Sequence, residues 1–316
     1  MKKFLLKHLL LVITLTSTTI SASAASYITH NGIRYVYNSA KTEVSVTSLK
    51  SPEVYVGDIV VPSTITNSAD QVIPVVGVGN SAFNNCTNVT SVTLPESVKK
   101  IGDYAFDSCE GLKSVTMPGV ETIGHWAFRN CYALESLELP ENLTSIGNFS
   151  FDKNLKITEI TIPSGVTLIG GFAFEGNPQL TKITCLSSTP AEIKKGYLDG
   201  EEIYTIFDDT DYSGRTLYVP KGATDNYKSK LGWNYFPNIV EFDPSGITDA
   251  KFSKKFEVVA NGNNSITISA SKGDNIIIVN LNGQLMKRFK ATEGANTITD
   301  LPSGFIIVNG TKVLVK

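Results

Sequence analysis

The sequence predicts a mainly β protein, in which a solenoid of stacked coils with a parallel strand ladder is followed by a small antiparallel β-domain. Three observations predict this fold. One motif recurs with a period of 22 or 23 residues, a repeat length that is typical of solenoids. Each copy contains a short segment of alternating apolar and polar residues, the pattern of a strand with one buried face. Residues 251–316 replace this motif with short apolar runs and Asn-Gly turns.

The N-terminal segment, residues 1–24, has the pattern of a secretory signal peptide. Three lysines precede an apolar run from Leu9 to Ile20, and the small residues Ala22-Ser23-Ala24 follow it. The run is shorter than the roughly 20 residues that cross a bilayer. We therefore expect an exported chain without a transmembrane helix, either secreted or held at the cell surface. The alternative is an uncleaved membrane anchor.

The charge balance of the exported part argues against nucleic acid as a partner. Removal of the three leader lysines leaves 25 Lys and Arg against 30 Asp and Glu residues. Nucleic-acid-binding domains carry basic patches that neutralise phosphates. A mildly acidic chain without clustered charge does not have this property.

Each copy of the repeat centres on a phenylalanine that follows Ala or Ser. An apolar-Gly pair lies four or five residues before it, and in the first four copies a proline lies twelve residues after it. The proline ends the alternating segment, because proline cannot donate to a strand ladder. The single 22-residue period results from one residue missing after Pro118. The repeat phenylalanines are Phe83, Phe106, Phe128, Phe151 and Phe174, and the predicted strands lie in 91–95, 114–118, 136–140 and 159–163.

The consensus apolar-Gly-x-x-Ala-Phe-x-x-Cys-x-x-Leu-x-x-Val-x-Leu-Pro resembles the BspA-like bacterial leucine-rich repeats. Residues 75–186 carry it five times. The resemblance implies a curved solenoid, with the strand ladder on its concave side and mostly irregular coils on its convex side. It also implies a surface-exposed protein that mediates adhesion or binds host and matrix proteins. The fifth copy departs from the pattern, since Leu186 replaces its proline, as expected where an array ends in a cap.

The segments on either side of the array have the composition of caps. Residues 25–74 contain short strand patterns and predict a β-rich N-terminal cap, whereas residues 187–243 predict a C-terminal cap. Aromatic residues of the second cap are expected to cover the open apolar edge of the last coil, although a ligand-binding role is the alternative. These residues are Tyr218, Tyr227, Trp233 and Phe236.

Beyond a linker at 244–250, residues 251–316 predict a small β-sandwich-like domain. Asn282-Gly283 and Asn309-Gly310 each separate two apolar runs, and Asn-Gly suits the positive φ angles of a two-residue hairpin turn. The segment resembles the C-terminal sorting domains of the type IX secretion system. That resemblance implies contact with secretion machinery and passage across the outer membrane. A generic terminal β-domain is the alternative.

The cysteines show no pattern of a disulfide or metal site. Cys86, Cys109 and Cys131 lie three residues after their repeat phenylalanines, and Asn154 and Asn177 occupy the same slot in the next copies. A slot that also accepts Asn predicts a small buried side chain. The remaining cysteine, in the fifth predicted strand, is interpreted as a buried apolar residue. The paired Cys or Cys/His spacing of metal sites does not occur.

The sequence predicts no catalytic residue and no cofactor. The histidines outside the leader, His30 and His125, have no recognisable partners for a hydrolytic triad. The segment Asp209–Gly214 fits the first six positions of a calcium loop, but Pro220 occupies the twelfth, where such loops carry Glu. We therefore expect a protein that is not an enzyme, and an acidic hairpin tip at this segment.

Two rows of side chains are the candidate binding surface. The first row is the outward position of each predicted strand, where short hydroxyls could hydrogen-bond a partner or simply suit exposed β-structure. The second row lies two residues before each repeat phenylalanine and is mostly aromatic. It is expected to lie at least partly exposed, as a stripe for a protein or a sugar ring, or to pack on itself. The first row is Thr93, Thr116, Glu138, Thr161 and Thr184, and the second is Ser81, Tyr104, Trp126, Phe149 and Phe172.

These observations favour a non-catalytic protein that works by binding, through adhesion or protein–protein interaction. Two other functions stay open. An exposed aromatic stripe would favour an accessory protein that captures glycans, and a repeat surface without a ligand would favour a structural component of the envelope. The partner is thus an extracellular protein or a glycan, which the repeat pattern alone does not identify.

Overall fold

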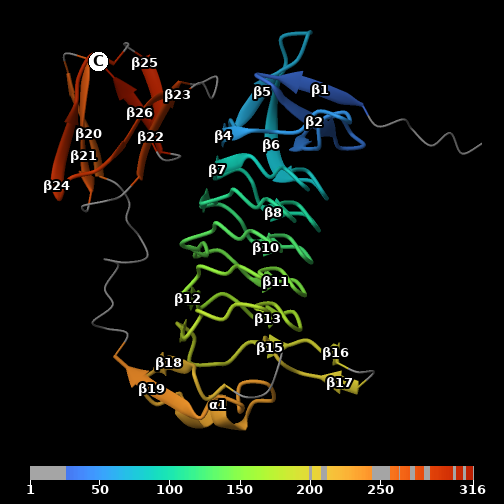
Figure 1. The fold of residues 1–316 in the computed structure, drawn as a ribbon. Helices are drawn as coiled ribbons and strands as arrows, with labels where there is room; N and C mark the ends of the chain where they lie inside the picture. Colours follow the sequence, from blue (N-terminus) through green and yellow to red (C-terminus); the bar gives the residue numbers. More distant parts are fainter. Residues whose placement is uncertain are drawn as a thin grey trace, which may run out of the picture.

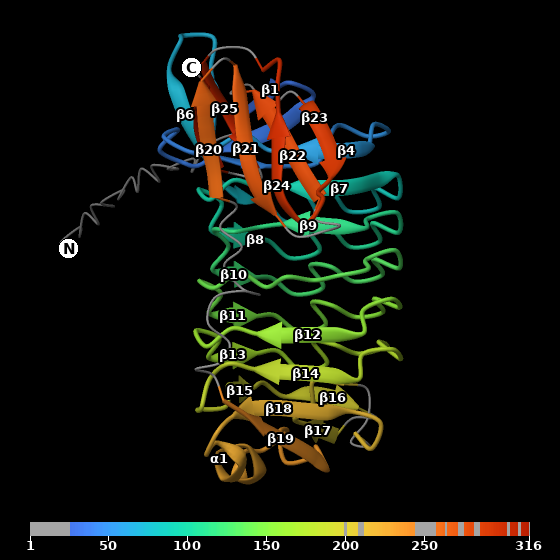
Figure 2. The ribbon, with the colours of Figure 1, turned by 90° about the vertical axis from the view of Figure 1, so that its left-hand side faces the viewer.

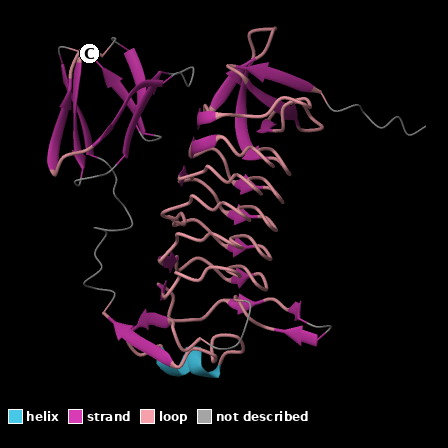
Figure 3. Ribbon diagram, viewed as in Figure 1, coloured by secondary structure: helices cyan, strands magenta, loops and turns pink. Residues whose placement is uncertain are grey.

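Figure 1 shows the repeats of the computed structural model stacked as a column of coils. The strands are short and the rest of each coil is loop (Figure 3). Residues 257–315 form a separate β-domain with its own core. The structure describes residues 26–198, 201–207, 212–243, 257–262, 264–270, 275–280, 285–301, 304–308 and 311–315.

One parallel ladder, here called the Ile ladder, joins the apolar-Gly pairs of successive coils. Equivalent residues are paired, so that Ile101 lies opposite Ile123 and Ile123 opposite Ile146. The side of each coil that was predicted to be irregular therefore contains a short strand, which is two residues long in most coils. The Ile ladder comprises β6 (Val72–Val78), β8 (Lys100–Ile101), β10 (Thr122–Ile123), β11 (Ser145–Ile146), β13 (Leu168–Ile169) and β15 (Glu192–Ile193).

The second parallel ladder, here called the Thr ladder, contains the predicted alternating segments. Thr93 lies opposite Thr116, and Thr161 opposite Thr184. Figure 2 shows this ladder in face view in the lower coils. Its first part is β4 (Gly57–Val60), β7 (Val89–Thr93) and β9 (Ser114–Thr116), and its second part is β12 (Glu159–Ile162), β14 (Lys182–Cys185), β18 (Thr216–Pro220) and β19 (Asn238–Phe242).

The strand predicted at 136–140 is wrong, and the Thr ladder is divided at this coil. Leu137 and Leu139 are buried and Glu138 is exposed, so the alternation is present, but the segment pairs with neither β9 nor β12. The missing residue of the 22-residue repeat lies in the turn just before this coil. There Gly119 is so close to the preceding coil that a Cβ atom would lie 1.9 Å from the Glu96 carbonyl oxygen. The turns of these two coils are therefore in close contact just before the coil that lacks the strand.

A column of stacked phenylalanine rings fills the centre of the array. Successive repeat phenylalanines have ring centroids 4.9 to 5.4 Å apart and planes within 9° of parallel. All five are buried. Tyr55 extends the column by one ring at its start, 4.7 Å from Phe83. The ring spacing is close to the strand spacing of about 4.8 Å, so rings and ladders have a common repeat.

A sixth coil follows the five that the phenylalanine spacing predicts. Ile193 of β15 continues the Ile ladder, Phe207 lies 6.5 Å from Phe174, and β18 continues the Thr ladder. A hairpin of β16 (Gly196–Leu198) and β17 (Glu201–Ile203) is inserted into this coil. The insertion separates the motif residues, which is why the spacing alone does not reveal the coil.

Both ends of the column are closed. At the start of the column an antiparallel meander joins β6 through its last strand; it consists of β1 (Tyr27–His30), β2 (Ile33–Tyr37) and β3 (Val44–Val46). Strand β5 (Thr64–Thr66) pairs with the first three residues of β6. At the other end, helix α1 (Thr224–Ser229) and β19 follow the last coil.

Three of the four aromatic residues predicted to cover the last coil are buried there, namely Tyr227, Trp233 and Phe236. The Trp233 Nε1 donates to the Ala191 carbonyl oxygen at 2.8 Å. The prediction is wrong for Tyr218, which is half-buried and lies beside Thr184 in the Thr ladder. It occupies an outward position of a strand, and side chains alternate between the two faces of a strand.

The C-terminal domain consists of two antiparallel sheets. The pairs of strands expected on either side of the Asn-Gly dipeptides are adjacent and antiparallel, as predicted. The dipeptides themselves lie outside the described residues. One sheet has the order β20 (Glu257–Gly262), β21 (Ser265–Ala270), β24 (Gly294–Ile298), and the other β23 (Leu285–Lys290), β22 (Asn275–Asn280), β25 (Gly304–Val308), β26 (Thr311–Val315).

Within the described part of the chain, no helix has the length and apolar character needed to span a bilayer.

We predict that Gly119→Ala destabilises the protein by about 1–3 kcal/mol, because its methyl group would overlap the backbone of Glu96. Gly214→Ala is the matched control, since a Cβ atom there meets nothing within 4 Å. Urea unfolding of the two variants and the parent protein measures the effect. Equal midpoints for both variants would contradict the close approach of these two coils.

Candidate binding surface

The aromatic residues that precede the repeat phenylalanines form one continuous stack. The ring centroids of Tyr104 and Trp126 are 5.0 Å apart, those of Trp126 and Phe149 are 5.5 Å apart, and those of Phe149 and Phe172 are 5.2 Å apart. The planes of the first three rings are within 5° of parallel. These four residues are here called the aromatic stripe. The structure therefore brings together the four aromatic residues that the sequence aligns.

The aromatic stripe is exposed along only part of its length. Tyr104, Trp126 and Phe149 are half-buried, whereas only 2% of Phe172 is exposed. The expectation of an exposed Phe172 is wrong because strand β16 covers it. A Cβ atom on Gly196 would lie 2.1 Å from the Phe172 ring, so glycine is required for this close approach. Solvent reaches three rings of the stripe.

The backbone of the aromatic stripe has a left-handed conformation that aromatic residues disfavour. Its residues, together with Ser81 in the same slot, have φ between 53° and 58°. A second slot four residues later is also left-handed, and there the residues are mostly Asn, Ser or Gly, which tolerate this conformation. Aromatic side chains in the first slot run against local preference. The second slot contains Asn85, Ser108, Asn130, Lys153 and Gly176.

A ladder of side-chain acceptors lies one residue before the stripe and connects the coils. Each acceptor accepts a hydrogen bond from the backbone N–H of the equivalent residue in the next coil. The distances are 3.0 Å from Asp103 N to Asn80 Oδ1, 2.8 Å from His125 N to Asp103 Oδ1, and 2.8 Å from Asn148 N to His125 Nδ1. His125 is thus a hydrogen-bond acceptor of the scaffold. Sequence reasoning missed this ladder, although its residues all follow the glycine of the apolar-Gly pair.

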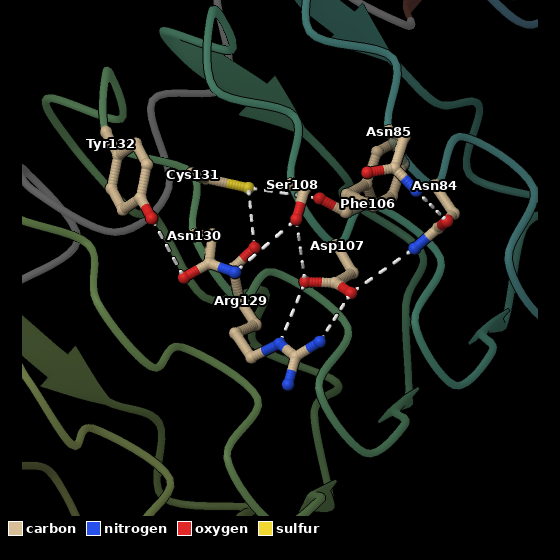
Figure 4. A network of polar contacts seen from close by, with 9 residues as sticks. All are labelled: Asn84, Asn85, Phe106, Asp107, Ser108, Arg129, Asn130, Cys131 and Tyr132. Carbon is tan, nitrogen blue, oxygen red and sulfur yellow. Dashed lines mark hydrogen bonds and ion pairs between the residues drawn. The ribbon is translucent and has the colours of Figure 1, made fainter.

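A charged pair of Asp107 and Arg129, shown in Figure 4, lies near Tyr104 of the stripe. Asp107 is 4% exposed and accepts hydrogen bonds from Arg129 Nε at 2.9 Å and Nη2 at 2.8 Å, and from Asn84 Nδ2 at 3.2 Å. The bond to this carboxylate raises the pKa of Arg129. Its guanidinium carbon lies 5.9 Å from the Tyr104 ring centroid. A fixed cation therefore lies beside the aromatic rings, in a place that the sequence pattern did not identify.

The outward row of the Thr ladder is less uniform than predicted. Thr116 and Glu138 are exposed and Thr161 and Thr184 are half-buried, but Thr93 is 7% exposed. Its expected outward exposure is therefore wrong, although Thr93 is paired in the ladder like the others, with Val60 of β4 opposite it. The row also loses its regular spacing at Glu138, where the ladder is divided. It forms a weaker candidate surface than the aromatic stripe.

The four cysteines are free and buried, and three share a slot with two asparagines. The slot has a hydrogen-bonding role. Cys131 Sγ donates to the Phe106 carbonyl oxygen at 3.2 Å, and Asn154 Nδ2 donates to the Phe128 carbonyl oxygen at 3.0 Å. Cys109 and Asn177 likewise donate to the repeat phenylalanine of the preceding coil. A small donor is what the slot requires, which explains the exchange of Cys for Asn.

No group of three or more His, Cys, Asp or Glu residues suited to a metal ion occurs within the described ranges. Asp209 and Asp211, the acidic residues of the calcium-loop pattern, lie outside them. Tyr212, which follows them, is buried and packs against Phe207 and Phe236.

The repeats are similar in sequence to a known family. Residues 77–200 match, in six copies, the sequence model of a family described as BspA type leucine rich repeat region. Similar solved structures include a leucine-rich repeat protein of T. pallidum (24% identity, 61% of this chain and 81% of that chain, TM-score 0.49) and one from Bacteroides ovatus ATCC 8483 (23%, 68% and 70%, 0.44). A leucine-rich cell surface protein from Faecalibacterium prausnitzii A2-165 is also similar (21%, 69% and 76%, 0.37). No curated protein matches the chain.

We predict that the free energy of unfolding falls as the pH rises from about 8.5 to 10. Burial raises the pKa of Cys185 to about 12, and it also raises the pKa of the other three thiols. Unfolded thiols ionise near pH 8.5, whereas the folded thiols have raised pKa values and ionise only at higher pH. Their contribution to stability is therefore complete below pH 8.5 and is lost above it, by about 1 kcal/mol per pH unit for each thiol that stays protonated. Urea unfolding at pH 7 and pH 10 measures the loss.

Cys109→Asn/Cys131→Asn is the matched variant for this measurement, because Asn occupies the same slot in two other coils. Its alkaline loss is expected to be smaller than that of the parent protein. The same loss in both proteins would show that the thiols do not cause it.

Proposed function

Because residues 77–200 match the sequence model of a family described as BspA type leucine rich repeat region, we propose that this protein is exported and works at the cell surface by binding, without catalytic activity of its own. Its partner is an extracellular protein, and the contact is made by Tyr104, Trp126 and Phe149 with Arg129 beside them. One observation carries the proposal: three solvent-accessible aromatic rings are held in parallel by a left-handed backbone that aromatic residues disfavour.

The residue types of this surface favour a protein partner. Tyr, Trp and Arg are the residues most enriched at the energetic centres of protein interfaces. The rings are immobilised by stacking, so little side-chain entropy remains to be lost when a partner binds. Arg129 is held in a bidentate pair with Asp107, which fixes the position of its charge.

The orientation of the rings argues against the glycan alternative. Sugars stack on the faces of aromatic rings, but here the faces of Trp126 and Phe149 are turned toward neighbouring rings of the stripe. What solvent reaches is mainly ring edges, whose partial positive charge suits carbonyl and carboxylate oxygens. The two terminal rings, Tyr104 and Phe172, each have one face that does not meet another ring of the stripe, and β16 covers that of Phe172. The face of Tyr104 is left without a ring because Ser81 occupies the slot in the preceding coil. One such face is a small platform for a sugar.

The structural-envelope alternative assigns the same rings to stability alone. Strained backbone conformations persist where surrounding interactions determine them. In that case the stacked rings would compensate for their own backbone cost. Binding measurements on a folded variant that lacks the rings distinguish the two functions.

We predict that Tyr104→Ser/Trp126→Ser lowers partner affinity about 30-fold or more, as expected when residues at the centre of an interface are removed. Serine is suitable because Ser81 already adopts the same backbone conformation. The measurement is binding of the full chain to an array of extracellular-matrix proteins and glycans. Tyr132→Ser, at an exposed tyrosine outside the stripe, is the matched control and should bind normally.

Thermal unfolding of the three proteins checks that each variant is folded. If the double variant is folded and binds with unchanged affinity, the aromatic stripe is not the binding surface. Saturable binding to glycans alone would favour glycan capture. If the parent protein binds nothing on the array, the envelope-component function is favoured.

We propose further that residues 1–24 direct export and that residues 251–316 direct passage across the outer membrane through a secretion machinery. The support is the leader pattern together with a terminal β-domain that has a core of its own. Such a domain can direct secretion without contributing residues to the binding surface of the repeats.

We predict that deletion of residues 251–316 abolishes surface display while the shortened protein accumulates in the periplasm. Display is measured by protease accessibility in intact cells, beside a variant with a Gly-Ser insertion in the linker. If the shortened protein still reaches the surface, the terminal domain is not the address.

A further inference from the structure

The two sheets of the C-terminal domain leave one side of the domain open. Strand β20 lies beside β26 and closes the first side. On the opposite side, β24 is the edge strand of one sheet and β23 the edge strand of the other, and they are not paired with each other. A groove of about 340 Å³ lies between them. This volume is at the lower end of the range of ligand sites and suits a few extended residues.

The groove follows the edge of β24. Four consecutive residues of this strand, Ala295 to Ile298, line it. Successive side chains of a strand point to opposite faces of the sheet. A groove that is lined by four consecutive residues therefore runs along the edge of the strand, where the backbone groups lie. Within the described residues, β24 pairs only with β21 and has a second edge without a strand. Such an edge is a template for a further strand.

The other wall of the groove is basic and partly apolar. Lys287 and Lys290 of β23 are exposed, and neither forms an ion pair with the described residues. Phe289 lies between them in the sequence and is half-buried, whereas Ile298 of β24 lines the groove but is only 3% exposed. No acidic side chain lines this groove among the described residues.

From this geometry we propose that the groove binds an extended acidic segment of a partner polypeptide, which adds a strand to the free edge of β24. The backbone of the segment pairs with β24, acidic side chains meet Lys287 and Lys290, and apolar side chains contact the half-buried Phe289. Backbone pairing provides affinity in this mode of recognition, and alternate side chains provide specificity. The inference holds whether or not residues 251–316 direct secretion.

The test is fluorescence polarisation with a labelled eight-residue peptide of alternating Glu and Val and the full chain. We expect saturable binding that weakens as salt is raised. The variant Lys287→Glu/Lys290→Glu should lower the affinity at least tenfold. The control Lys113→Glu/Lys228→Glu reverses two exposed lysines outside this domain and should leave it unchanged.

Two further ligands separate strand addition from simple attraction of anions. A peptide of the same sequence with methyl groups on alternate backbone nitrogens keeps its charge but loses half of its donors, and should bind at least tenfold more weakly. Equal binding of the methylated peptide would overturn the proposal. Displacement of the peptide by inorganic polyphosphate at equal charge concentration would also overturn the proposal, because this result would show that the groove binds anions in general. Absence of peptide binding at about 1 mM would also overturn it.

Discussion

The stacking of one phenylalanine ring on the next is the interaction on which the rest of this structure depends. Its spacing of 4.9 to 5.4 Å matches the distance between neighbouring strands, so each coil can satisfy the ring column and both ladders at once. The Cys or Asn slot strengthens this arrangement by donating to the carbonyl oxygen of the preceding phenylalanine. A coil alone has neither a partner ring nor a partner strand, which is why the motif is repeated.

The position of the aromatic stripe follows from this core. Two left-handed residues, four apart, bracket each Ala-Phe or Ser-Phe pair and turn it toward the centre of the column. The residue in the first of these slots is then aligned with its equivalents in neighbouring coils at the same spacing as the core rings. Four coils have an aromatic residue in this slot, although its backbone conformation favours Asn or Gly. This departure from the local preference supports a binding role for the slot. The charged pair of Asp107 and Arg129 lies at the end of the stripe that is open to solvent.

The ends of the column are handled by different means. The N-terminal cap supplies Tyr55 as an additional ring and a meander that joins the Ile ladder. The last coil is interrupted by the β16–β17 hairpin, which covers Phe172, and is closed by the buried Tyr227, Trp233 and Phe236. The C-terminal domain has a separate core and free strand edges of its own. The repeats and the terminal domain therefore present separate surfaces.

The repeat period, the buried phenylalanines, the alternating strands and the alignment of the aromatic residues were determined by the sequence alone, because each depends on spacing and on burial of apolar side chains. The left-handed slots, the acceptor ladder that includes His125, and the pair of Asp107 with Arg129 depend on contacts between residues 22 or 23 positions apart, and only the tertiary structure decided them. The same holds for the division of the Thr ladder at 136–140, where the alternating pattern is present but the segment pairs with neither β9 nor β12. The burial of Phe172 likewise depends on an inserted hairpin whose position no periodicity predicts.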